Sequence, residues 1–218
     1  MRTQDHFYYS KASKLYVPSV TKILDIIAKG EFFNAWLKKQ GANADKLLTE
    51  AGDFGTNVHN MLEAIGRGIT INLDCLKPKE RRCVEAFIAW KDAKVARFIE
   101  TEHEVCTPTY GGTMDALVEL KDGRVALLDY KTSKYIYDTY DLQVASYVKA
   151  YELNTGKKVD TGFILRFEKQ DDNKIDMEEK EVLNISESFE LFECARRLWV
   201  WKHKDKLDNA NSLTKKEN

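Results

Sequence analysis

The sequence predicts a mixed α/β fold of the α+β type, built as one domain. Apolar residues follow helical spacing up to about residue 100 and then give way to β-branched and aromatic runs. The predicted order is helices, three strands, one helix, two strands and one helix, as in a sheet with helices packed on it. A chain of 218 residues can also bury a core without disulfides. We expect one domain at 1–204, with an N-terminal helical part at 18–100 and a core at 101–202, then a flexible tail at 205–218.

Glycine and proline punctuate the helical half of the chain. Apolar residues at a spacing of three and four predict the helices between these breaks. A glycine-bearing loop is expected at 52–56. The expected helices are a short one from Ser19 that ends before Gly30, one at 32–39, one from this loop to Gly66, and the longest at 78–99.

Turn signals separate the strands of the second half, at Gly111-Gly112, Asp122-Gly123 and Asp171-Asp172-Asn173. One helix interrupts the strands and ends at Asn154-Thr155-Gly156, where glycine favours a left-handed cap. The expected strands are 103–109, 113–120, 124–131, 161–168 and 174–182, and the expected helices are 141–153 and 186–201.

Composition excludes several classes of protein. With 34 Lys+Arg and 35 Asp+Glu the formal net charge is -1, so any nucleic-acid contact must come from a local basic surface. No apolar run approaches the roughly 20 residues of a membrane span, and the N-terminus lacks the apolar stretch of a signal peptide. None of the four cysteines forms a C-x-x-C pair, which argues against a zinc ribbon or an iron–sulfur cluster. We expect reduced thiols, no membrane partner and a cytoplasmic location.

One predicted hairpin carries the chemistry. Its three-residue loop, Lys121-Asp122-Gly123, suits a type I turn with glycine in the left-handed position. Residues that face each other across this hairpin then have numbers that sum to 244, so Asp115 lies opposite Asp129 with their β-carbons about 4.5–5.5 Å apart. Lys131 points to the same face as Asp129.

Two facing carboxylates repel, so either one is protonated or a cation lies between them. Mg²⁺ favours carboxylate and carbonyl oxygens, and Lys131 beside it could orient or deprotonate water or stabilise charge on a phosphate. Two other interpretations stay open. In one, the acids line a solvated face that Lys131 neutralises; in the other, a two-residue loop puts the two aspartates on opposite faces.

Pairs of polar residues one helical turn apart flank this hairpin in sequence. Gln143 and Tyr147 share one helix face, as do His59 and Glu63, although Glu63 could simply pair with Arg67. Gly55-x-x-x-His59, Gly112-x-x-Asp115, Asp129-Tyr-Lys131 and Gln143-x-x-x-Tyr147 resemble, in order and spacing, the motifs of the RecB-like branch of the PD-(D/E)XK nucleases. The resemblance covers about residues 55–150.

Two shorter segments extend the resemblance. Val17-Pro-Ser-Val-Thr-Lys-Ile-Leu24 and Asp129-Tyr-Lys-Thr-Ser133 are similar to segments of the mitochondrial genome maintenance exonuclease and its phage and bacterial relatives. The family fold that this implies is restriction-endonuclease-like, a central mixed sheet flanked by helices.

The resemblance also implies residue roles. Lys131, Asp115, Asp129 and His59 would be catalytic, and Mg²⁺ or Mn²⁺ would be held by Asp115, Asp129, His59 and the backbone carbonyl of Tyr130. A further acid, Glu102 or Glu104, often belongs to such sites, and the sequence does not choose between them. Substrate contacts would come from Gln143, Tyr147, Ser19 and Lys134, although Ser19 also suits a helix N-cap and Lys134 precedes two tyrosines suited to base stacking.

The implied activity is a Mg²⁺- or Mn²⁺-dependent DNA exonuclease acting on single-stranded DNA or DNA ends. Such an enzyme would serve recombination, repair or replication, with proteins of those processes as partners, in a bacterial or phage-infected cell. Only Cys194 follows the Gln143 helix and no P-loop exists, so we expect neither an iron–sulfur cluster nor a bound nucleotide. The alternatives are a non-catalytic DNA-binding module on this fold, a structure-specific endonuclease, and an adaptor protein whose paired aspartates face solvent.

Overall fold

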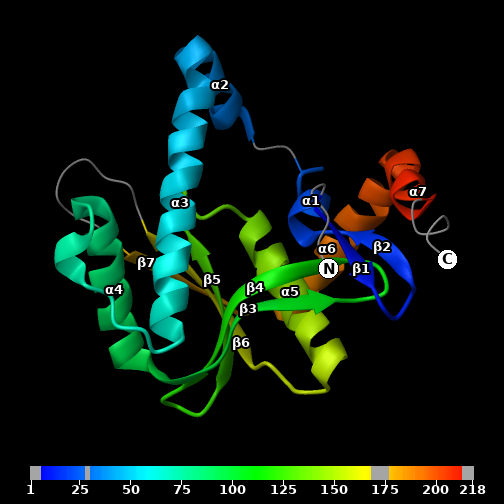
Figure 1. Cartoon of the computed structure of the whole chain (residues 1–218). Helices are drawn as coiled ribbons and strands as arrows, with labels where there is room; N and C mark the ends of the chain where they lie inside the picture. The colour runs from blue at the N-terminus through cyan, green and yellow to red at the C-terminus, as the bar shows by residue number, and fades with distance from the viewer. Residues whose placement is uncertain (1–5, 28–29, 168–176, 213–218) are drawn as a thin grey trace.

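A computed structural model describes residues 6–27, 30–167 and 177–212 of the chain (Figure 1). Its centre is a five-stranded sheet in the order β3-β4-β5-β6-β7. The pairs are antiparallel except β5 with β6, which run parallel across the crossover through α5, so the sheet is mixed. The strands are β3 (Val95–Cys106), β4 (Gly111–Leu120), β5 (Val125–Lys131), β6 (Thr161–Phe167) and β7 (Met177–Val182).

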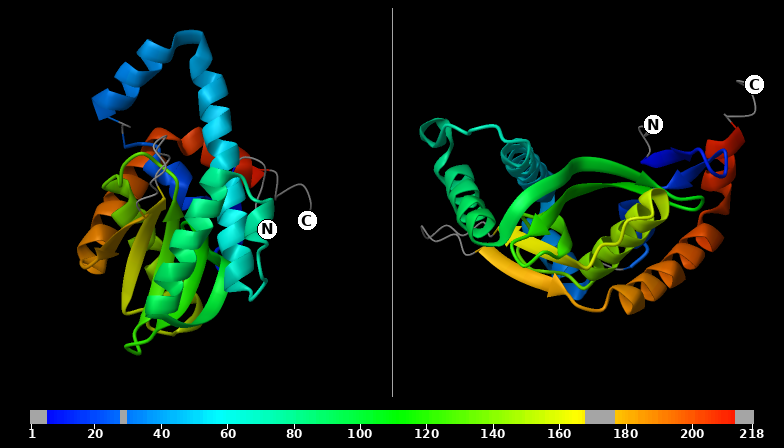
Figure 2. Two further views of the ribbon diagram at one scale, coloured as in Figure 1. Left: turned by 90° about the vertical axis from the view of Figure 1, so that its left-hand side faces the viewer. Right: turned by 90° about the horizontal axis from the view of Figure 1, so that it is seen from below.

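Helices cover both faces of this sheet, as the two views of Figure 2 show. One face packs α3 (Ala44–Gly66) and α4 (Pro78–Lys94) against Val118 and Leu128. The other packs α1 (Val20–Leu24), α5 (Thr139–Thr155) and α6 (Ile185–Lys202) against Leu117 and Leu127. The predicted fold class, a mixed central sheet flanked by helices, is confirmed.

The smaller elements attach at the edges. A hairpin of β1 (Phe7–Ser10) and β2 (Leu15–Pro18) adjoins α1, and helix α2 (Gly30–Gln40) leads through the short turn η1 (Gly41–Asn43) into α3. The turn η2 (Leu73–Cys75) precedes α4. Helix α7 (Lys204–Ser212) occupies part of the expected tail, because the Asn211 side chain accepts from the Tyr16 backbone N at 2.7 Å and donates to its carbonyl at 3.1 Å.

The structure departs from the predicted elements at several points. The predicted helix at 78–99 ends at Lys94, because the next residues pair with β4 and begin strand β3. The loop expected at 52–56 lies within α3. The β1–β2 hairpin was not expected at all, and the predicted strand positions 168 and 174–176 lie outside the described residues.

The hairpin register follows the prediction. Ala116 pairs with Leu128 and Glu119 with Val125, both with numbers that sum to 244, and Gly123 has a φ of 87° at the turn. The ordered pairs end at Ala116–Leu128, so the two aspartates lie one position beyond the ladder. That is where the strand edges separate and a site can form.

Candidate active site

His59 reaches the end of the sheet because α3 approaches β5 closely. Gly55 lies one helical turn before His59, and a β-carbon on Gly55 would stand 2.9 Å from Thr132 Oγ1. Only glycine permits this approach without a shift. The glycine in the Gly55-x-x-x-His59 motif therefore serves helix packing, and the helix then places His59 beside Asp115 in β4.

Asp115 ties three elements together. Its Oδ1 lies 3.3 Å from His59 Nδ1, and its Oδ2 accepts a hydrogen bond from the Tyr130 backbone N at 2.6 Å. Burial acts to raise the pKa of Asp115, but His59, Lys131 and the bond from Tyr130 together hold that pKa below its usual range. The carboxylate is therefore ionised and fixed between helix α3 and strand β5.

Glu102 completes a cluster with these two residues. One ligand atom from each of His59, Glu102 and Asp115 lies within 4.8 Å of the others. Glu102 has a left-handed φ of 48°, a conformation that costs free energy in a residue with a β-carbon and that is concentrated at functional sites. Within the described residues Glu104 is not part of this cluster, so the structure favours Glu102 as the further acid.

Asp129 and Lys131 form a second pair beside the first. Lys131 Nζ lies 2.6 Å from Asp129 Oδ2, and the Asp129 side chain is only 2% exposed. The geometry of this contact is that of an ion pair rather than a hydrogen bond, and Oδ2 has no hydrogen-bond partner among the described residues. Burial, reinforced by the Asp115 charge and partly offset by Lys131, raises the pKa of Asp129 to about 6.

The acids of the site favour the charged forms of its two basic side chains. Burial acts to lower the pKa of His59, yet Asp115 and Asp129 outweigh it and the pKa is raised. Burial also acts to lower the pKa of Lys131, and again the two aspartates raise it. The Lys131 ammonium in addition lies 4.7 Å from the centre of the Tyr140 ring, a cation–π contact.

Gln143 and Tyr147 support the site from α5. Gln143 Nε2 donates to Tyr147 Oη at 3.3 Å, and the Tyr147 ring is buried. A β-carbon on Gly112 would lie 2.4 Å from Tyr147 Cε1, so this glycine makes room for the ring. Burial, and then the nearby Asp129 and Asp115 charges, raise the pKa of Tyr147. The buried tyrosine packs against β4 at Gly112, and its predicted substrate contact stays a prediction.

The remaining predicted contacts differ in accessibility. Ser19 is buried, and its Oγ accepts from the Lys22 backbone N at 3.1 Å, so its predicted role as N-cap of α1 is confirmed. Its side chain is not on a surface where DNA could pass. Lys134 is exposed and its Nζ lies 5.3 Å from the centre of the Tyr135 ring. Tyr135, Tyr137 and Tyr140 continue from there in successive edge-to-face contacts toward Lys131.

The donor set suits a divalent cation. Two carboxylates and an imidazole within 4.8 Å of one another can share an ion at coordination distances of about 2.0–2.6 Å. Asp129 lies next to this set, with one oxygen that lacks a hydrogen bond. Coordination of the ion by Asp129 and by the Tyr130 carbonyl stays a prediction. The structure favours His59, Glu102 and Asp115 as the primary ligands.

The sequence pattern of the PD-(D/E)XK nuclease superfamily matches residues 74–215, well over half of the chain. The chain belongs to this superfamily. The matched segment holds Glu102, Asp115, Asp129 and Lys131, whereas His59 lies before it. Membership supports nuclease activity for the chain.

Comparison with solved structures supports the fold through one of the two matches described here. A protein from Eubacterium rectale described as a candidate exonuclease aligns with a TM-score of 0.53 and 16% identity, over 92% of this chain and 86% of that chain. The structure of SSO0001 aligns with a TM-score of 0.40 and 16% identity, over 88% of this chain and 79% of that chain. No curated protein matches the sequence significantly. At such identities the agreement concerns the fold alone.

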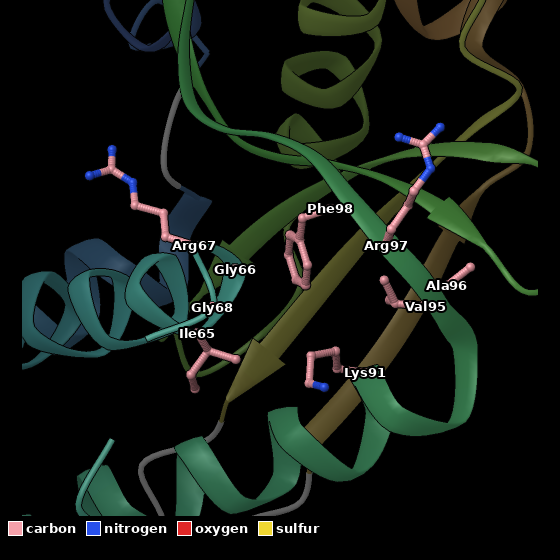
Figure 3. Close-up of a pocket in the computed structure, with 9 residues that line it drawn as sticks. All are labelled: Ile65, Gly66, Arg67, Gly68, Lys91, Val95, Ala96, Arg97 and Phe98. Carbon is pink, nitrogen blue, oxygen red and sulfur yellow. The ribbon is translucent and has the colours of Figure 1, made fainter. Parts of the chain in front are cut away.

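Two other features bound the search for a site. A cavity of about 370 Å³ lies between the ends of α3 and α4 (Figure 3). Its two arginines already form ion pairs, Arg67 with Glu63 at 2.5 Å and Arg97 with Glu119 at 2.6 Å, and Figure 3 shows both directed away from the cavity.

Among the described residues no helix combines the length and apolarity needed to cross a bilayer.

Proposed function

We propose that the chain is a metal-dependent DNA exonuclease of the RecB-like branch, related to the mitochondrial genome maintenance exonuclease and its phage and bacterial relatives. The observation that carries the proposal is the convergence of two acid–cation pairs, His59–Asp115 and Asp129–Lys131, with Glu102 beside the first. Superfamily membership supports hydrolysis of a phosphodiester bond. The metal, the substrate form and the biological process are parts of the proposal.

The ion would be Mg²⁺ or Mn²⁺, held by Asp115, Glu102 and His59 with Asp129 adjacent. When bound, it would lower the pKa of a coordinated water and offset charge on the scissile phosphate. An imidazole ligand fits Mn²⁺ better than Mg²⁺, which prefers oxygen atoms alone. We therefore expect Mn²⁺ to bind more tightly than Mg²⁺.

Lys131 acts in this proposal as a fixed positive charge. The aspartates raise its pKa, so the side chain is an ammonium group and a poor base at neutral pH. Its role is to stabilise the negative charge that develops on the phosphate during cleavage. Asp129 holds the ammonium in place through the 2.6 Å ion pair.

The tyrosines beside Lys131 favour unpaired DNA. Tyr135 is 55% exposed and Tyr137 is 41% exposed, and the two rings meet edge-to-face. Nucleobases that are not paired can stack on exposed aromatic rings, each for about 1–3 kcal/mol. A single strand or a frayed DNA end could therefore lie along these rings with a phosphate near Lys131.

The test is digestion of single-stranded, blunt and flapped DNA with labels at the 5′ or 3′ end, in Mn²⁺, Mg²⁺ or EDTA. We expect cleavage with either metal and none in EDTA, with shortening from an end. Lys131→Ala and Asp129→Ala should reduce the rate by at least about a hundredfold. Lys158→Ala is the control, because Lys158 is 80% exposed and lies near the start of β6, at the opposite end of the parallel β5–β6 pair.

Each alternative gives a distinct result. Binding of labelled DNA without cleavage in both metals would support a non-catalytic module, and cleavage of circular single-stranded DNA would support an endonuclease. Parent-like cleavage by both active-site variants would refute the assignment. The same proposal includes a role in recombination, repair or replication, together with proteins of those processes. It places the chain in the cytoplasm of a bacterial or phage-infected cell.

A further inference from the structure

Helix α6 has a buried face and a second apolar face that no described residue covers. Phe192, Ala195 and Trp199 point inward against α1 and α5. Beside this buried face, toward solvent, runs a row of residues that we call the outer stripe. Its members are Leu191 (55% exposed), Cys194 (exposed), Leu198 (51% exposed) and Trp201 (78% exposed).

The spacing of the outer stripe is that of a helix-packing seam. The intervals of three, four and three residues place all four side chains in one line, as at the a and d positions of a heptad. The stripe runs from Leu191 to Trp201, about 15 Å along the helix. Single exposed leucines are ordinary on a protein surface, but a continuous line that ends in a largely exposed tryptophan marks a contact site.

The charges beside the stripe are divided along its length. Glu187 and Glu190 flank its N-terminal half, and Arg197 and Lys202 flank its C-terminal half. If a second α6 packed in the antiparallel direction, the acidic half of each helix would meet the basic half of the other. In the parallel direction, the two acidic halves would face each other and the two basic halves would face each other, and like charges repel.

We propose that the chain forms a two-fold symmetric homodimer in which the outer stripes of two α6 helices pack antiparallel. Such an interface is isologous, so one self-complementary surface serves both copies. Figure 2 shows α6 (orange) along the outer edge of the molecule, and the sheet separates it from α3, which carries His59. The dimer leaves both sites open.

The size of the stripe makes this a weak dimer. Stable interfaces bury roughly 1,200–2,000 Å² in total, and one pair of short helical seams lies at or below the lower limit. The association should therefore appear in sedimentation equilibrium as concentration rises toward about 1 mM. The parent protein should change from monomer to dimer over that range and should not form larger species.

Three variants test the geometry. Leu198→Glu should weaken association at least about tenfold, because each dimer would bury two added charges. Glu187→Lys with Glu190→Lys gives a wholly basic stripe, and Arg197→Glu with Lys202→Glu gives a wholly acidic one. Neither charge variant should associate with itself, whereas a mixture of the two should form a heterodimer. Circular dichroism melting confirms that each variant is folded.

Cysteine cross-linking provides an independent readout. Cys194 lies in the stripe and Cys75 is exposed near α4, so the chain contains its own control. A short bis-maleimide should link two copies through Cys194 in the parent and in Cys75→Ser, and not in Cys194→Ser. A parent that stays monomeric throughout the concentration range, as it would if another protein occupied this face, overturns the proposal. So does a dimer that Leu198→Glu and the charge variants leave unchanged.

Discussion

Replacing Gly112 with alanine should destabilise the protein by overpacking the contact between β4 and α5. The new β-carbon would lie 2.4 Å from Tyr147 Cε1, whereas carbon atoms in contact normally stand about 3.5–4.0 Å apart. The ring would have to move by more than about 1 Å within a packed core, and such overpacking costs about 1–3 kcal/mol. The hydrogen bond from Gln143 to Tyr147 depends on the same ring position.

Thermal melting measures this effect directly. For a chain of this size each kcal/mol shifts the melting temperature by about 2–4 °C, so we expect Gly112→Ala to lower it by about 2–12 °C. Gly52→Ala is the matched control, because a β-carbon there meets nothing within 4 Å in the middle of α3. It should be neutral or stabilising by up to about 1 kcal/mol.

The double variant separates steric clash from other causes. Tyr147→Leu removes the ring edge that the β-carbon would meet, so adding Gly112→Ala to it should cost less than the same change in the parent. A parent-like melting temperature for Gly112→Ala would refute the reasoning. An equal cost in the presence and absence of the Tyr147 ring would refute it as well, because the two positions would then be independent.

Three further outcomes follow from the site. Mn²⁺ at a hundred times its Kd should stabilise the parent by about 2.7 kcal/mol, or about 5–11 °C in melting temperature, and Asp115→Asn should remove that shift. Protons compete with the ion at Asp129, whose pKa burial raises to about 6, and at His59, whose pKa is also raised, so the Mn²⁺-induced shift should grow with pH between about 5 and 7; a shift that is equally large at both ends would contradict this. Tyr137→Ala should weaken binding of single-stranded DNA by about tenfold while Tyr137→Phe retains it, as gel-shift titration in Ca²⁺ can check.

The hairpin shows what local sequence can determine. The length of the Lys121-Asp122-Gly123 loop and the left-handed glycine fix the pairing sum of 244, and the register then brings Asp115 next to strand β5. Because turn type and strand register are coupled, the loop sequence alone was enough to predict the pairing of the two strands. The resemblance to nuclease motifs supplied His59, which no local rule connects to the hairpin.

The choice between Glu102 and Glu104 shows where local sequence fails. Strand alternation places both on the same face, since they are two residues apart. In the structure the two residues differ in backbone conformation, because Glu102 has a positive φ. Residues with a β-carbon rarely adopt this conformation, and no nearby glycine in the sequence indicates it. A strained backbone of this kind depends on the surrounding tertiary contacts, so it could not be read from the residues themselves.

The predicted end of the helix at 78–99 was wrong for a different reason. Val95, Phe98 and Ile99 continue the apolar spacing of α4, and the same residues suit a strand. Pairing across to β4, from Val95–Leu120 onward, decides the outcome. Similarly, Gly55 suggested a loop, whereas its lack of a side chain serves the close approach of α3 to Thr132.

The structure also changes the reason why two acids can lie together at the end of the hairpin. The sequence argument required either a proton or a divalent cation to offset their repulsion, or a solvated face neutralised by lysine. In the structure each aspartate lies beside a basic side chain, His59 for Asp115 and Lys131 for Asp129, so the lysine of the sequence argument does offset one of the two acids. An imidazole binds a metal only in its neutral form, and the pKa of His59 is raised because Asp115 outweighs burial, so a proton on His59 competes with an incoming ion. The same competition acts at Asp129, whose pKa burial raises to about 6. Metal binding at this site should therefore weaken as the pH falls.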